Sequence, residues 1–147
     1  MPKMTGARFL ADTLQAYGVT HIFFMPGIVK RALFEMDERT NIDRILTHGE
    51  KSAVYMADGY ARASGRPGIC MAQTVGASNL AAGLRDPYLG CSPVIAITGG
   101  TETDTQYRNV YQEVEDLSMF DPVTKFNVRV EQVERFPDLL REAFRCA

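Results

Sequence analysis

Short apolar runs alternate with helical patterns along most of this 147-residue chain, and this alternation restricts the fold more than any other feature. The first apolar run, residues 19–25, follows a helical pattern over residues 6–17 and ends at Pro26-Gly27. Its length and the turn that closes it are typical of a buried parallel strand. A chain that alternates in this way is expected to fold into a parallel sheet with helices on both faces.

The same patterns predict the remaining elements. We expect further strands at residues 42–47, 68–74, 93–98 and 123–130. We expect helices at residues 29–38, 50–64, 78–89 and 131–146, and a short one around residues 112–119. Together they predict a three-layer α/β/α domain with a mostly parallel central sheet of about five to six strands. The length fits a single domain over residues 1–147.

Composition argues against several classes of partner. The net charge is -2 and no basic run occurs, so we expect neither nucleic acid nor an anionic membrane as a partner. The sequence shows no apolar run of membrane length and no secretory signal pattern. Cys70, Cys91 and Cys146 lack the spacing of a metal site. We therefore expect a cytoplasmic protein with reduced thiols and no metal ligands of its own.

Glu50 lies at the entrance of the predicted helix 50–64, in the passage HGEKSAVYMADGYAR. Thr47 followed three residues later by Glu50 fits a capping box, in which both side chains bind free N–H groups at the helix start. A carboxylate among small and apolar residues can instead act as an acid/base partner for a cofactor nitrogen. The local pattern leaves both interpretations open.

Ligands of open parallel sheets bind beyond the carboxyl ends of the strands. Pro26-Gly27, Glu50, the turn 73–79 and residues 99–101 each follow a different predicted strand. We therefore expect these groups to lie together, with Glu50 and Asn79 at the same end of the sheet.

The turn 73–79 can be interpreted in two ways. A glycine turn that opens a helix offers N–H groups to an anion, but it can also be a tight connection with Ser78 or Asn79 as the cap. Neither GxGxxG nor GxxxxGK[ST] occurs in the chain, which argues against a nucleotide site.

Four segments, in order, resemble the N-terminal pyrimidine-binding domain of thiamine diphosphate enzymes of the acetolactate synthase type. They are MTGARFLADTLQAYGVTHIFFMPG, the passage around Glu50, GYARASGRPGICMAQTVGASNLAAGLRDPYLGCSPVIAITGG and VYQEVEDLSMFDPVTKFN. The resemblance implies the thiamine diphosphate-binding fold, with Glu50 hydrogen-bonded to N1′ of the aminopyrimidine ring. In that family this contact promotes ylide formation in carboligases and decarboxylases (transferases and lyases) that act on 2-oxo acids.

The resemblance also implies roles for other residues. Cofactor-binding positions would be Pro26, Gly27, Glu50, Thr74, Gly76 and Asn79. Tyr111 and Gln112 resemble the family's Phe-Gln pair near the reacting carbon, and Lys125 resembles a lysine that follows it. These three are substrate-side candidates; a solvated Gln112 and a surface Lys125 are the alternatives.

Three departures from the family pattern keep us from transferring its substrate. Val75 stands where the family usually has proline, and Tyr111 adds a hydroxyl to the family's phenylalanine. Gly49 stands where the family often has histidine. We therefore expect His48 and His21 to be structural.

The chain lacks the GDG sequence with which the family holds the diphosphate through Mg²⁺; Asp58-Gly59 is preceded by Ala57. Mg²⁺ would be bound by a missing domain or partner chain, and an FAD site would lie largely outside this chain. The expected partner is a diphosphate-binding domain, in another chain or in a missing C-terminal part, within a homodimer or larger assembly. We expect no activity from the isolated chain.

Two alternatives stay open. The chain can be the separate alpha subunit of a two-chain 2-oxo acid decarboxylase of the sulfopyruvate type. It can also be a non-catalytic binding or assembly module that keeps the fold without the chemistry.

Overall fold

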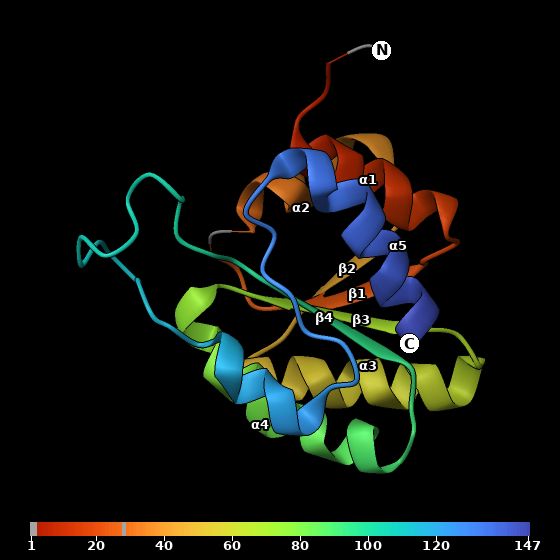
Figure 1. Ribbon diagram of the computed structural model, residues 1–147. Helices are drawn as coiled ribbons and strands as arrows, with labels where there is room; N and C mark the ends of the chain where they lie inside the picture. Colours follow the sequence, from red (N-terminus) through yellow and green to blue (C-terminus); the bar gives the residue numbers. More distant parts are fainter. Residues whose placement is uncertain (1–2, 28) are drawn as a thin grey trace.

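A four-stranded parallel sheet lies between two layers of helices in the computed structural model, which describes residues 3–27 and 29–147 (Figure 1). The strand order is β2-β1-β3-β4, with bounds β1 (His21–Phe24), β2 (Asp43–Leu46), β3 (Gly68–Ala72) and β4 (Val94–Thr98). One face carries α1 (Gly6–Ala16), α2 (Lys30–Arg39) and α5 (Phe136–Cys146). The other carries α3 (Glu50–Ser64) and α4 (Ala77–Leu89). The predicted α/β class is confirmed, but the sheet has four strands rather than five to six.

The two faces of the sheet have separate cores. Because successive residues of a strand point to opposite faces, β3 sends Ile69 and Met71 to one core and Cys70 and Ala72 to the other. All five residues of β3 are buried, since this strand has a neighbour on each side and helices above and below. No helix in the described part of the chain is long and apolar enough to cross a membrane.

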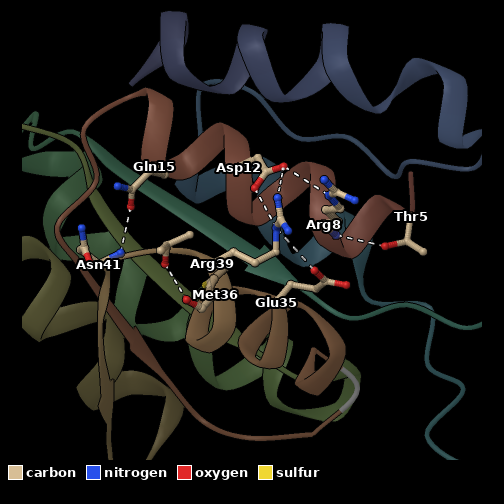
Figure 2. A network of polar contacts seen from close by, with 9 residues as sticks. Thr5, Arg8, Asp12, Gln15, Glu35, Met36, Arg39 and Asn41 are labelled. Carbon is tan, nitrogen blue, oxygen red and sulfur yellow. Dashed lines mark hydrogen bonds and ion pairs between the residues drawn. The ribbon is translucent and has the colours of Figure 1, made fainter. Parts of the chain in front are cut away.

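Polar contacts join α1 and α2 at the surface (Figure 2). Thr5 caps α1 by accepting a hydrogen bond from the Arg8 N–H at 3.2 Å. Asp12 lies 3.2 Å from Arg39 and 3.6 Å from Arg8. Exposed ion pairs of this kind contribute at most about 1 kcal/mol each, so buried apolar contacts hold the helix layer in place.

The segment after β4 differs from the prediction. A 3₁₀ helix, η2 (Leu117–Val123), replaces the helix expected around residues 112–119, and residues 124–130 are irregular instead of forming a strand. β4 is therefore an edge strand. A cavity of about 1170 Å³ lies beside β4, and residues 124–130 also line it. The prediction was wrong because a strand needs a neighbouring backbone, and the described chain places none within pairing distance of this segment.

Candidate functional site

The carboxyl ends of β1, β2 and β3 bring together residues from three connections. Pro26 and Gly27 follow β1, Glu50 follows β2, and the turn containing Thr74 and Gly76 follows β3. They share one edge of the sheet because the three strands are parallel.

Glu50 is the first residue of α3 and is half-buried. Its Oε2 accepts a hydrogen bond from Asn79 Nδ2 at 3.2 Å, which joins the first turns of α3 and α4. Glu50 and Asn79 therefore lie at the same end of the sheet, as expected. Glu50 Oε1 has no hydrogen bond to any residue that the structure describes. One carboxylate oxygen is thus held by the protein, and the other is available to a ligand.

Gly76 shapes the space around this carboxylate. The residue is buried, and a Cβ built on it would stand 2.6 Å from Glu50 Oε1. Its φ of -79° is open to any residue, so glycine is needed here for space rather than for backbone conformation. Any larger residue would displace the Glu50 carboxylate.

The capping-box interpretation of Thr47 and Glu50 is wrong. Gly49 is the N-cap of α3 and makes no side-chain cap hydrogen bond. Thr47 Oγ1 instead donates toward the carbonyl oxygens of Phe24 at 3.2 Å and Gly49 at 3.0 Å. The hydroxyl therefore ties the end of β2 to the end of β1, and the Glu50 carboxylate turns toward α4.

Buried polar atoms without partners lie in the β3–α4 turn and nearby. The turn forms a short 3₁₀ helix, η1 (Thr74–Gly76). Thr74 is 3% exposed, and its Oγ1 has no hydrogen-bond partner among the described residues. Gln112 Oε1 is also buried without a partner in this part of the chain. Unpaired buried polar groups each cost about 1–3 kcal/mol. A bound ligand could relieve that cost.

Sequence reasoning missed Gln73. Its Oε1 accepts a hydrogen bond from Gln112 Nε2 at 3.2 Å, and its side chain packs against Gly27, where a built Cβ would stand 2.3 Å from Gln73 Oε1. Gln73 thus connects the β1–α2 connection to the long loop after β4. Its place directly after β3 was the signal that could have found it.

The substrate-side candidates separate in the structure. Gln112 is half-buried and reaches the site through Gln73. Tyr111 is 88% exposed, and Lys125 is exposed along the cavity beside β4. Of the three substrate-side candidates, Gln112 is therefore the one that a described contact connects to the carboxyl end of the sheet.

No described hydrogen bond or ion pair joins either histidine to the Glu50 carboxylate. His21 is the first residue of β1, at the amino end of the sheet, and its ring nitrogens lie 2.8 Å from Thr20 Oγ1 and 3.5 Å from Asp43. His48 is exposed just before α3. These contacts of His21 are consistent with the structural role that we expect for it.

Sequence comparisons show which proteins this chain is similar to. Residues 4–119 match the family described as "Thiamine pyrophosphate enzyme, N-terminal TPP binding domain". The chain is 37% identical over 145 residues to a "Probable acetolactate synthase large subunit" from Methanocaldococcus jannaschii, covering 98% of this chain and 24% of that protein. It is 33% identical over 146 residues to an "Acetolactate synthase" from Bacillus subtilis, covering 99% of this chain and 26% of that protein. The chain spans about a quarter of the length of these curated relatives.

Proposed function

Because this chain belongs to the thiamine pyrophosphate enzymes as an N-terminal cofactor-binding domain, we propose that Glu50 hydrogen-bonds the aminopyrimidine ring of thiamine diphosphate and activates the cofactor. The observation that carries the proposal is the placement of the Glu50 carboxylate. Asn79 holds Oε2, Gly76 leaves room beside Oε1, and no described residue binds Oε1.

The residues around Glu50 fit an aminopyrimidine. Such a ring presents a nitrogen that accepts a proton and an amino group that donates hydrogen bonds. Glu50 Oε1 suits the ring nitrogen when the acid is protonated. Gln112 Oε1 can accept from a donor such as the amino group, and the Thr74 hydroxyl can donate or accept. These unpaired groups support a polar, nitrogen-rich ligand at this end of the sheet.

When bound, thiamine diphosphate supplies a carbon nucleophile that attacks a carbonyl carbon. The part of this chain is to place a proton. Glu50 shares a proton with the ring nitrogen, and Asn79 orients the carboxyl group through Oε2. The half-buried position of Glu50 limits competition from water for that proton.

We propose further that the chain acts within a longer acetolactate synthase-like carboligase or decarboxylase that acts on a 2-oxo acid. Relatives with acetolactate synthase in their names are about four times as long as this chain and support this proposal. Another domain would hold the diphosphate together with Mg²⁺. Mg²⁺ takes oxygen ligands, and those ligands also meet the phosphates. That domain would come from the same chain or from a second copy in a homodimer or larger assembly.

Glu50→Gln in the longer protein tests the role of Glu50. With Mg²⁺ and thiamine diphosphate present, we expect hydrogen–deuterium exchange at C2 of the bound cofactor to slow by about 10²–10⁴-fold. Calorimetry should still detect cofactor binding, and circular dichroism should show an unchanged fold. Glu38→Gln is the matched control, since Glu38 is an exposed residue of α2. Unchanged C2 exchange in Glu50→Gln would refute the proposed role.

A further inference from the structure

Gln73 and Gly76 lie at the two ends of the short turn between β3 and α4. Gln73 is the N-cap residue of η1, and its backbone carbonyl accepts the Gly76 N–H at 3.1 Å. Gly76 leaves room for the Glu50 carboxylate. The half-buried Gln73 side chain instead contacts Gly27 and Gln112. One turn therefore connects the Glu50 carboxylate to Gln112.

Gly27 fixes the Gln73 side chain by close packing. A Cβ built on Gly27 would stand 2.5 Å from Cβ of Gln73, 2.9 Å from its Cδ and 2.3 Å from its Oε1. The Gln73 side chain therefore lies against the Gly27 backbone along its length. Gly27 also has a φ of 155°, which side chains other than glycine rarely permit. The β1–α2 connection thus sets where the Gln73 amide group can lie.

The hydrogen bond between the two glutamines determines which end of the Gln112 amide stays free. A glutamine side chain has a carbonyl oxygen that accepts and an amino group that donates. Gln112 Nε2 donates to Gln73 Oε1 at 3.2 Å. Gln112 Oε1 is then left as an acceptor, and it is buried without a partner among the described residues. Gln73 therefore makes Gln112 present an acceptor, rather than a donor, to a ligand.

The backbone at Gln112 has an uncommon conformation that its surroundings hold. Its φ is 64°, in the left-handed region, which few residues other than glycine adopt. Next to it, the Glu113 carboxylate accepts hydrogen bonds from the N–H groups of Tyr107 and Val110. Among the described side-chain hydrogen bonds, the one to Gln73 joins residues 101–114 to the β3–α4 turn. Strained residues of this kind are common at ligand sites, where neighbouring contacts maintain them.

We propose that Gln73 is a positioning residue, which holds Gln112 so that Gln112 Oε1 accepts a hydrogen bond from the amino group of the cofactor's aminopyrimidine. This inference rests on the proposed function, because it takes thiamine diphosphate as the ligand. A 2-oxo acid is ionised near neutral pH and offers only acceptor oxygens, so it lacks the donor that Gln112 Oε1 needs. Gln73 acts through Gln112 and does not itself bind the cofactor.

A double-mutant cycle of cofactor binding in the longer protein tests this role, with calorimetric titration of thiamine diphosphate in the presence of Mg²⁺. Methionine has a similar length to glutamine but lacks the amide. We expect Gln73→Met and Gln112→Met each to raise the Kd about three- to tenfold, the loss of one hydrogen bond. The double variant should match Gln112→Met alone, because Gln73 acts through Gln112.

Gln132→Met is the matched control, since Gln132 is exposed and makes no side-chain hydrogen bond within the described part of the chain. It should keep the wild-type Kd. A wild-type Kd in Gln73→Met would overturn the proposal, and so would losses that add in the double variant. Where Gln73→Met lowers the thermal midpoint, Gln73→Ala replaces it in the cycle, because alanine is too short to press on Gly27.

A cofactor analogue separates positioning from a general disturbance of the site. The analogue is thiamine diphosphate with an oxo group in place of the amino group of the pyrimidine. It presents an acceptor to Gln112 Oε1, so the proposed hydrogen bond cannot form. We therefore expect Gln73→Met to bind the analogue no more weakly than the wild type does. If Gln73→Met weakens binding of the analogue as much as binding of thiamine diphosphate, the positioning role is wrong.

Failure of the proposed function gives a different result. A wild-type protein that does not bind thiamine diphosphate would refute the proposed function and this inference together. If the wild type binds the cofactor and Glu50→Gln slows C2 exchange, but Gln73→Met keeps the wild-type Kd, only the role of Gln73 fails.

Discussion

The carboxylate of Glu50 lies against Gly76, so closely that a methyl group on Gly76 would stand 2.6 Å from Glu50 Oε1. The two residues come from different connections, β2–α3 and β3–α4. The absence of a side chain at Gly76 therefore determines where the proposed proton partner can sit.

Gly76→Ala should impair cofactor activation without unfolding the protein. The added methyl group displaces the Glu50 carboxylate, while the backbone at φ -79° accepts alanine without strain. We expect C2 exchange of bound thiamine diphosphate to slow by about tenfold or more, corresponding to about 1.4 kcal/mol, with a near-normal thermal midpoint. Gly59→Ala is the matched control, because nothing lies within 4 Å of a Cβ at that position in α3. This control should gain up to about 1 kcal/mol of stability and keep the wild-type rate of C2 exchange. If C2 exchange is at the wild-type rate in both variants, Gly76 has no part in placing Glu50.

Asp58 should contribute to stability in a pH-dependent way. Burial acts to raise the pKa of Asp58, but hydrogen bonds from Arg62 and Ser92 and the Arg62 charge outweigh it, and the pKa falls below its ordinary 3.8. Asp58 Oδ1 lies 2.9 Å from Arg62 Nε. A lowered folded-state pKa stabilises the fold above the unfolded-state pKa, and this contribution is lost as pH falls through the folded-state value.

Urea unfolding of wild type and Asp58→Asn checks this sign. The wild type should be more stable by a constant difference between about pH 5 and 7, and the difference should shrink below about pH 4. Asp104→Asn, at an exposed loop position, should show no such trend. A difference that grows toward low pH would contradict the lowered pKa.

The three free thiols should react at different rates. Cys70 is fully buried in β3, and burial raises its pKa to about 12, whereas Cys91 is exposed and Cys146 is half-buried. Because the thiolate is the reactive form, an aromatic disulfide reagent at pH 8 should label Cys91 first and Cys146 next. Cys70 should react only as the protein unfolds. Cys70→Ala should leave the two faster labelling phases unchanged. If one of these phases disappears in the variant, Cys70 is accessible in the folded protein.

Local patterns predicted most elements of the fold. α3 spans residues 50–64 as expected, because Glu50 begins a run of helix formers and Gly65 ends it in the left-handed conformation, with φ 66°. The four strands that pair were all predicted. The failures lie after β4, where residues 123–130 alternate like a strand but pair with no strand among the residues that the structure describes.

The sequence by itself determined the α/β class, the order of the elements and the position of Glu50 at the start of α3, because helix and strand periods and glycine breaks act within a few residues. Only the tertiary structure decided that the carboxylate turns toward Asn79, 29 residues away, rather than capping its own helix with Thr47. It also decided that one edge of β4 has no pairing strand in the described part of the chain. Both depend on groups far apart in the chain, whose meeting is set by the packing of parallel strands and helix layers rather than by any local pattern.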